Sequence, residues 1–167
     1  QVNLEDYGSI PYVQEKKRKR KNYRFHVNLL DERFPQIYLE EVRKLRIKVM
    51  KEMERHNYKT LMVTSSVPGE GKTTLATNLA IAIAKQGKRV ILVDADPRNP
   101  SVAEQLNIMT QKEQGLGAIL RNEISVEDAM KEVNVSAGEL FVLYGTEPEA
   151  EDAKLLGTAA MKNLINV

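Results

Sequence analysis

Residues 61–74 read LMVTSSVPGEGKTT, and this stretch decides the fold of the chain. A short apolar run, 61–64, leads into a loop with two glycines and then into an alanine-rich segment. The apolar run predicts a buried strand, and residues 72–86 predict a helix with Gly87 as its C-cap. The loop between them matches the pattern GxxxxGK[ST], except that Ser66 occupies the first glycine position.

The residue types in this loop are those that bind phosphate. Gly69 and Gly71 let the backbone curl, so that successive N–H groups can face one anion. The positive end of the following helix adds to this attraction. Lys72 can reach the outer phosphates, and the hydroxyl of Thr73 can ligate Mg²⁺. The sequence therefore predicts a site for ATP or ADP with Mg²⁺. The candidate nucleotide-binding residues are Pro68, Gly69, Glu70, Gly71, Lys72, Thr73, Thr74 and Arg98.

A second polar group, DADPR at residues 94–98, follows the apolar run Val90–Val93, which predicts another strand. In an open α/β sheet, ligands bind outside the carboxyl ends of the strands, so we expect Asp94 and Asp96 to lie near Lys72. Carboxylates near Mg²⁺ can hold its waters or accept a proton, although an aspartate in this place can also simply form a turn. The candidate catalytic residues are Lys72, Asp94 and Asp96, and the candidate metal ligands are Thr73, Asp94 and Asp96.

The rest of the sequence predicts a partial α/β domain of the P-loop NTPase kind, with a mostly parallel sheet flanked by helices. Residues 60–94 spell strand, loop, helix, strand, which is one βαβ unit. Residues 1–35 predict an extended basic arm, and residues 36–167 the domain. Further elements are expected as helices at 36–57, 102–106, 116–121, 125–133 and 153–165, and as a strand at 140–143.

Composition narrows the function classes. The 167 residues include no cysteine, which excludes disulfide scaffolds, thiolate zinc sites and thiol nucleophiles. The two histidines lie far apart in the sequence, so we expect no metal site built from histidine. Aromatic residues make up only 5% of the chain, so we expect no nucleic-acid partner. Six of the basic residues form one block, Lys16–Lys21. Such a block is either a solvated linker or a patch that lies on anionic lipid.

Three motifs together resemble those of the bacterial tyrosine kinases that act with polysaccharide co-polymerases in making capsule and exopolysaccharide. The Walker A loop over residues 64–74 has a wording typical of that family. The run Ile91–Arg98 fits its Walker A′ motif, three apolar residues followed by DxDxR. The helix before the loop fits its ExxRxxR oligomerisation motif through Glu40, Arg43 and Arg46. By spacing alone these three residues would also suit an ordinary salt-bridged helix surface.

The resemblance implies an ATP·Mg-dependent tyrosine autokinase that regulates capsular or exopolysaccharide polymerisation and export, at the cytoplasmic face of the bacterial inner membrane. It implies Lys72 on the β- and γ-phosphates, Thr73 on Mg²⁺, Asp96 on the metal through water, and Asp94 as base for the tyrosine hydroxyl. Implied partners are further copies in a ring and the membrane segment of a co-polymerase, fused or separate. The family's Walker B motif and C-terminal tyrosine cluster have no counterpart in these 167 residues, which predicts that the chain is part of a larger kinase module.

Two alternatives stay open. Deviant-Walker ATPases of chromosome partitioning and septum placement are switches that dimerise on ATP. They carry a lysine five positions before the loop lysine, where this chain has Val67. The other alternative is a non-catalytic, nucleotide-bound scaffold of a polysaccharide co-polymerase. The missing tyrosine cluster keeps this scaffold open as an alternative.

Overall fold

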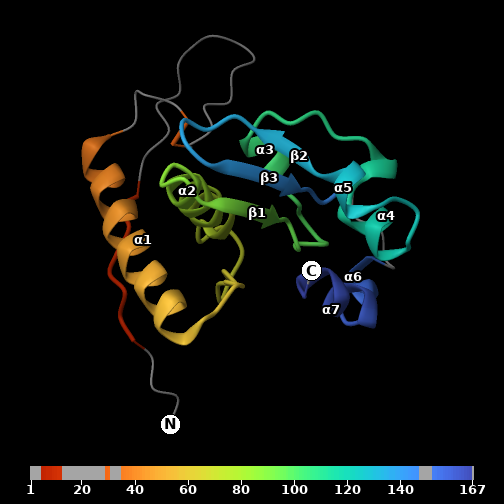
Figure 1. Cartoon of the computed structure of the whole chain (residues 1–167), viewed down its shortest axis with the longest axis horizontal. Helices are drawn as coiled ribbons and strands as arrows, with labels where there is room; N and C mark the ends of the chain where they lie inside the picture. Colours follow the sequence, from red (N-terminus) through yellow and green to blue (C-terminus); the bar gives the residue numbers. More distant parts are fainter. Residues whose placement is uncertain (1–4, 13–28, 31–34, 147–151, 167) are drawn as a thin grey trace. The chain divides into compact units, whose positions relative to one another are not determined.

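A computed structural model describes residues 5–12, 29–30, 35–146 and 152–166 (Figure 1). It divides the chain into two compact units, residues 1–83 and 84–167. The basic block Lys16–Lys21 lies outside the described residues, and the predicted domain boundary after residue 35 stays a prediction. No helix in the described part of the chain combines the length and the apolarity needed to cross a bilayer.

The first unit is built on two helices, α1 (Gln36–His56) and α2 (Lys72–Ala84). The last residue of α2, Ala84, is the first residue of the second unit. Both predicted helices are confirmed. Helix α1 ends where Asn57 adopts a left-handed conformation and Tyr58 N–H donates to the carbonyl of Met53. Helix α2 is rich in alanine, the best helix former, and Gly87 follows it with φ +78°.

A small apolar cluster holds the first unit together. Tyr38 and Val42 of α1 pack with Ala82 of α2, and both α1 residues are buried. Ile10, from the predicted arm, packs against the same cluster. In addition, Lys48 Nζ donates to the carbonyl of Tyr7 at 2.9 Å. Residues 5–12 therefore run along α1 in an extended conformation (Figure 1).

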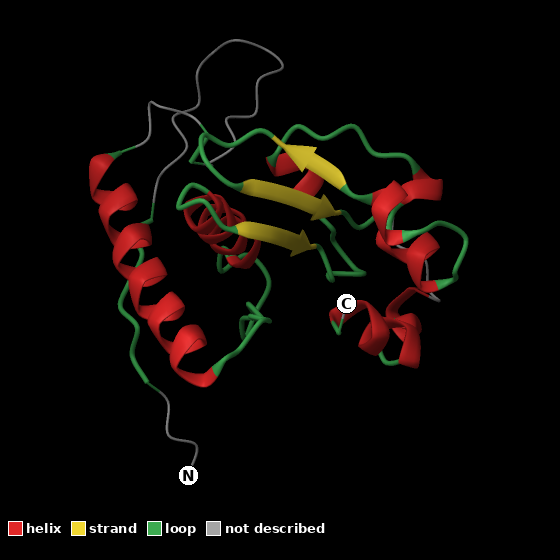
Figure 2. Cartoon of the chain, viewed as in Figure 1, coloured by secondary structure: helices red, strands yellow, loops and turns green. Residues whose placement is uncertain are grey.

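The second unit contains a three-stranded sheet in the order β1-β3-β2 (Figure 2). Strands β1 (Arg89–Val93) and β3 (Glu139–Leu143) are parallel, as predicted. Strand β2 (Lys131–Val133) pairs antiparallel with β3, so the sheet is mixed. The short helices of this unit are α3 (Val102–Gln105), η1 (Lys112–Gln114), α4 (Leu116–Leu120), α5 (Val126–Ala129), α6 (Asp152–Leu155) and α7 (Ala159–Ile165).

The core of the second unit lies on β3 and α4. Leu143 and Ile119 are buried together with Ala129 of α5, and Leu164 of α7 packs on this cluster. Position 138, just before β3, has no room for a side chain and is occupied by Gly138. A Cβ there would collide with the carbonyl oxygens of Ala84 and Lys88.

The predicted strand over residues 61–64 is absent, and with it the predicted βαβ unit over 60–94. These residues form neither helix nor strand, and they pair with no strand in the described part of the chain. Their side chains are also not buried as predicted, since Leu61 is 44% and Met62 82% exposed. An apolar run favours a strand, but the ladder itself needs a neighbouring backbone to accept and donate its hydrogen bonds.

Two predicted helices also differ from the structure. Residues 125–133 form the short helix α5 and then β2, because residues 131–133 pair with β3 instead of continuing the helix. Ser125 still caps α5 as predicted, since its Oγ accepts from Asp128 N–H at 3.1 Å. Residues 153–165 form α6 and α7, which are separated by a turn at Gly157.

Candidate nucleotide site

The glycine loop lies directly before α2, in the first unit. Gly69 and Gly71 adopt φ +83° and +90°, a left-handed region that other residues rarely adopt. No atom outside the loop crowds either position. The sequence places glycine there for the backbone conformation, as the phosphate-loop pattern predicts. The turn brings Pro68–Thr74 together at the N-terminus of α2.

The start of α2 suits an anion. Lys72 is its first residue, and the first intrahelical bond runs from Leu75 N–H to the Gly71 carbonyl at 2.8 Å. The dipole of a helix places positive potential at its N-terminus, where the backbone N–H groups point toward a bound anion. The first turn of α2 contains no acidic residue that would compete with a bound phosphate. Backbone and lysine thus offer positive potential in one place.

Glu70 turns its carboxylate back onto the loop. Its Oε2 accepts from the N–H of Ser66 at 3.0 Å and from the N–H of Val67 at 3.2 Å. The Ser66 hydroxyl lies 3.2 Å from the same oxygen. The hydrogen bond from Val67, followed by those from Ser66, lowers the pKa of Glu70. The role of Glu70 as a nucleotide-binding residue stays a prediction, and its carboxylate binds the loop's own amides.

Asp94 follows β1 in the second unit and is only 7% exposed. Its Oδ2 accepts from the N–H groups of Ser101 and Val102 at 2.9 and 3.0 Å, and its Oδ1 from Asp96 N–H at 3.3 Å. Burial raises the pKa of Asp94, although these three hydrogen bonds oppose the shift. The Asp94 side chain therefore has a structural role, because its hydrogen bonds join the end of β1 to the start of α3.

Asp96 and Arg98 form a turn beside it. Asp96 Oδ1 accepts from the N–H groups of Arg98 and Asn99, both at 3.1 Å. The Arg98 side chain is exposed. A cavity of about 20 Å³, room for one water, is lined by this turn and by residues after β3. Its lining includes Asp94, Asp96, Leu116, Gly117, Gly145 and Thr146.

The two motifs lie in different units, so the predicted closeness of Asp94 and Asp96 to Lys72 stays a prediction. Among the described residues, no three His, Cys, Asp or Glu side chains gather in a group that could hold a metal ion. The oxygen atoms of Thr73 and Asp96 have the hard character that Mg²⁺ prefers, so the donor types fit this ion.

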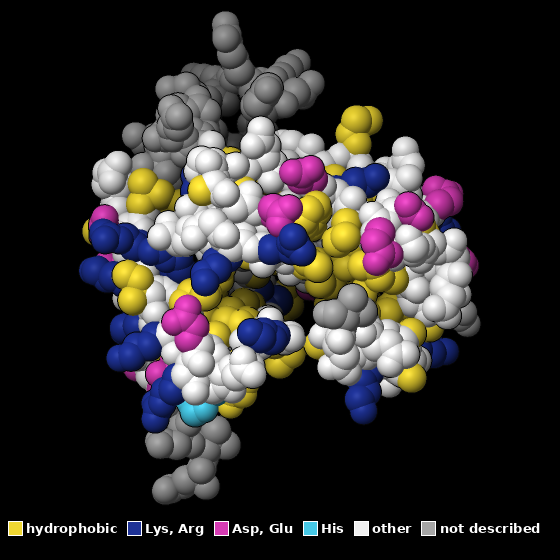
Figure 3. All heavy atoms as spheres, viewed as in Figure 1, with side chains coloured by type: hydrophobic (Ala, Val, Ile, Leu, Met, Phe, Trp, Pro, Cys, Tyr) yellow, Lys and Arg dark blue, Asp and Glu magenta, His cyan; other side chains and the backbone are white. Residues whose placement is uncertain are grey.

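The residues of the predicted oligomerisation motif share one flank of α1. Glu40 and Arg43 form an exposed ion pair at 3.5 Å. Arg46 instead donates to the carbonyl of Ala82, near the end of α2, at 3.3 Å. Arg46 therefore supports the packing of α1 on α2 within one chain. Figure 3 shows further Lys and Arg side chains over α1, where Lys44, Lys48, Lys51 and Arg55 are exposed.

Sequence reasoning missed Asn78, which is fully buried on α2. Its Nδ2 donates to the Thr74 carbonyl at 2.8 Å and to the Tyr38 hydroxyl at 3.2 Å. Its Oδ1 accepts from Leu29 N–H at 2.7 Å. This amide ties the first turn of α2 to α1 and to residue 29. The signal for it was a polar residue within the apolar segment ATNLAIAIA at 76–84.

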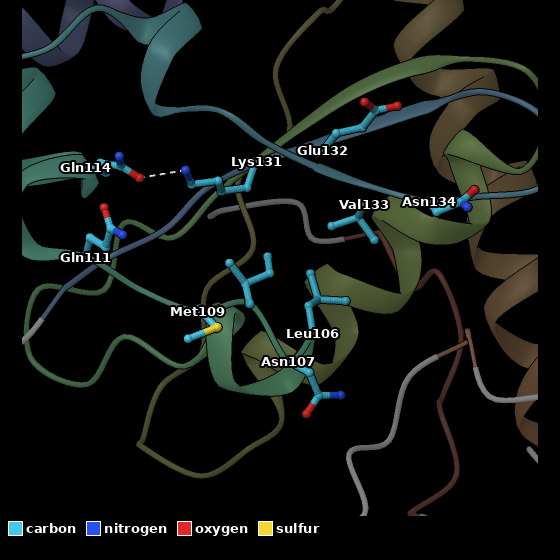
Figure 4. Close-up of a pocket in the computed structure, with 10 residues that line it drawn as sticks. Leu106, Asn107, Met109, Gln111, Gln114, Lys131, Glu132, Val133 and Asn134 are labelled. Carbon is cyan, nitrogen blue, oxygen red and sulfur yellow. Dashed lines mark hydrogen bonds between the residues drawn. The ribbon is translucent and has the colours of Figure 1, made fainter.

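A cavity of about 540 Å³ in the second unit is lined by none of the predicted site residues. It lies between β2 and the segment that follows α3 (Figure 4). Lys131 Nζ donates to Gln114 Oε1 at 2.6 Å across one side of it. Leu106, Met109 and Val133 supply apolar lining.

A family model for the CobQ/CobB/MinD/ParA nucleotide binding domain matches residues 61–165. The chain belongs to this family. The match begins at residue 61, just before the glycine loop, and runs through both motifs into α7. Membership confirms the predicted P-loop type of fold and a nucleotide-binding domain.

The proteins to which the chain is similar include bacterial tyrosine-protein kinases. The chain is 40% identical over 106 residues to the tyrosine-protein kinase YwqD of Bacillus subtilis. The alignment covers 64% of this chain and 43% of YwqD. It is 30% identical over 108 residues to the succinoglycan biosynthesis transport protein ExoP of Rhizobium meliloti. This second alignment covers 64% of this chain and 14% of ExoP. The chain thus spans less than half the length of either relative.

The fold agrees with a solved kinase domain. The kinase domain of the Escherichia coli tyrosine kinase ETK superposes with a TM-score of 0.73, over 96% of this chain and 63% of that one. Sequence identity between the two is 22%, so this match supports the fold alone.

Proposed function

We propose that this chain is the nucleotide-binding part of a bacterial tyrosine autokinase, which transfers the γ-phosphoryl group of ATP to protein tyrosine. The observation that carries the proposal is the glycine loop before Lys72 at the start of α2, in a chain that is 40% identical to a tyrosine-protein kinase over 106 residues. Phosphoryl transfer depends mainly on positioning and charge stabilisation, and this loop supplies both for the phosphates.

The proposed roles follow the positions of the side chains. Lys72 binds the β- and γ-phosphates, and Arg98 contributes to nucleotide binding from its exposed turn. Thr73 would hold Mg²⁺ directly, and Asp96 would hold it through water. When bound, the ion neutralises charge on the phosphates. Asp94 is the proposed base for the tyrosine hydroxyl, and a pKa raised by burial suits a group that must accept a proton.

The biological setting rests on relatives. ExoP is a succinoglycan biosynthesis transport protein, which supports a part for this chain in polysaccharide polymerisation and export. We propose that it works at the cytoplasmic face of the bacterial inner membrane, with the membrane segment of a co-polymerase as partner. In this setting the block Lys16–Lys21 contacts anionic lipid, and Glu40, Arg43 and Arg46 contribute to a ring of copies.

Phosphotyrosine formation tests the kinase assignment. The full-length protein containing this chain is incubated with labelled ATP and Mg²⁺ and probed for phosphotyrosine, with Lys72→Met as the matched variant. We expect labelling in the wild type and its loss in the variant, because the lysine holds the transferred phosphate. Phosphotyrosine that survives Lys72→Met would exclude transfer at this site.

A partitioning-type ATPase switch is the second candidate, because the matching family includes MinD and ParA. Val67 stands against it, since it occupies the position of the additional lysine in such switches. Release of free phosphate that DNA or lipid stimulates, without phosphotyrosine, would favour the switch. ATP binding with neither product would favour the non-catalytic scaffold.

A further inference from the structure

The glycine loop contains an acidic side chain that a phosphate site would not be expected to carry. Glu70 lies between the two left-handed glycines, Gly69 and Gly71, two residues before Lys72. A carboxylate facing the bound phosphates would repel them. Its hydrogen bonds show that it faces elsewhere, toward the opening residues of the loop.

Three donors converge on this carboxylate. The N–H groups of Ser66 and Val67 both donate to Oε2, at 3.0 and 3.2 Å, and the Ser66 hydroxyl donates to the same oxygen at 3.2 Å. Hydrogen bonds to an ionised acceptor are stronger than those between neutral groups. The contacts join the first residues of the loop to its apex.

The hydrogen bond from the Ser66 hydroxyl to Glu70 accounts for serine in place of glycine at position 66. The phosphate-loop pattern has glycine at this position, where the chain has a hydroxyl that reaches Glu70. Serine and glutamate thus form one pair across the loop. The Ser65 hydroxyl adds a bond to the Val67 carbonyl at 2.9 Å, which further restricts the same turn.

We infer that Glu70 is a positioning residue, whose carboxylate holds the loop closed through Ser66 and Val67 and so keeps the N-terminus of α2 ready for phosphate. This inference rests on the proposed function, because it concerns the affinity of the same site. A loop held in its binding shape before the nucleotide arrives loses less conformational entropy on binding. The affinity of an unheld loop is proportional to the fraction of time that the loop spends in its binding shape.

Binding of ATP to the chain, titrated with Mg²⁺ present, tests the inference. We expect Glu70→Ala to raise the Kd for ATP by about 10-fold, as for a loop that is competent a tenth of the time. Glu70→Gln keeps an acceptor oxygen and should stay within about 3-fold of the wild type. Glu54→Ala, at an exposed position on α1, is the matched control and should leave the Kd unchanged.

A double-mutant cycle separates positioning from general damage. Ser66→Ala should weaken ATP binding in the wild type but not in Glu70→Ala, because the two residues act as one pair. The amide resonances of Ser66 and Val67 should move in Glu70→Ala, whereas those of β1 and β3 should not. Additive effects, or unmoved resonances, would overturn the inference.

The outcomes also separate this inference from the proposed function. If the wild type does not bind ATP, or Lys72→Met binds equally well, both are overturned. If binding depends on Lys72 but Glu70→Ala binds as well as the wild type, only the Glu70 inference fails. Tighter binding by both Glu70 variants would show that the carboxylate opposes phosphate, which also contradicts the inference.

Discussion

At the scale of single residues, the carboxylate of Asp94 joins a strand to a helix while standing in the proposed active site. Replacing it with alanine leaves the N–H groups of Ser101 and Val102 without their acceptor. We expect Asp94→Ala to lower the free energy of unfolding by about 1–3 kcal/mol, the usual cost of unsatisfied buried groups. Urea denaturation measures it. Unchanged stability would show that Asp94 has no structural part.

The contribution of Asp94 to the stability of the fold should change with pH in one direction. Burial, with a smaller contribution from the charge of Asp96, raises the pKa of Asp94 above its ordinary value of 3.8. A carboxyl whose pKa is higher in the folded state favours folding while it is protonated. Its contribution is therefore complete below pH 3.8 and is lost as the pH rises through the raised pKa. Relative to Asp94→Asn, the wild type should lose stability over that rise, and a constant difference would contradict the shift.

The buried amide of Asn78 offers a second test at this scale. Its partners include the Tyr38 hydroxyl, at 3.2 Å, and the Thr74 carbonyl. We expect Asn78→Ala to cost about 2 kcal/mol or more, because it leaves several buried groups unpaired. Tyr38→Phe removes one bond and should cost about 1 kcal/mol. The thermal midpoints of both variants measure this order, and the reverse order would contradict it.

At the scale of elements, two glycines should respond differently to substitution. Gly87, after α2, has φ +78° with open space around it, whereas Gly138 meets the backbone of Ala84 and Lys88. Gly87→Ala should cost about 1 kcal/mol from backbone strain alone. Gly138→Ala should cost about 2 kcal/mol or more, since backbone atoms must move. Denaturant midpoints compare the two, and equal losses would contradict the close approach.

Much of the element pattern could be predicted from the sequence. The spacing of apolar residues predicted α1, and the alanine-rich run predicted α2. Continuous apolar runs predicted β1 and β3. Residues 61–64 have the same kind of run, yet they form no strand. A strand depends on a partner that local sequence does not specify. For the same reason residues 131–133 pair with β3, although their local pattern favoured a helix.

The site could be predicted only in part. The pattern GxxxxGK[ST] located the loop, because glycine at 69 and 71 reflects a backbone requirement. The direction of the Glu70 side chain has no counterpart in that pattern, since the carboxylate could face the ligand or the loop. The fold decides such a choice through hydrogen bonds to nearby amides. Sequence spacing does not contain them.

At the scale of the whole molecule, α1 is proposed to contribute to assembly as well as to packing. Arg46 donates to the Ala82 carbonyl, whereas the ion pair of Arg43 is exposed. We expect Arg43→Ala to weaken self-association without loss of thermal stability, and Arg46→Ala to reduce both. Lys44→Ala, another exposed cation of α1, is the control. Sedimentation velocity measures assembly, and identical profiles for the wild type and Arg43→Ala would exclude this role for Arg43.

The central claim is that the glycine loop and Lys72 bind the phosphates of a nucleotide. Calorimetric titration of the chain with ATP and Mg²⁺ tests it most directly. We predict saturable binding at one site in the wild type, and a Kd raised by at least about 10-fold in Lys72→Met, because the lysine charge lies on the phosphates. No measurable heat of binding in the wild type, or equal affinity in the variant, would contradict the claim.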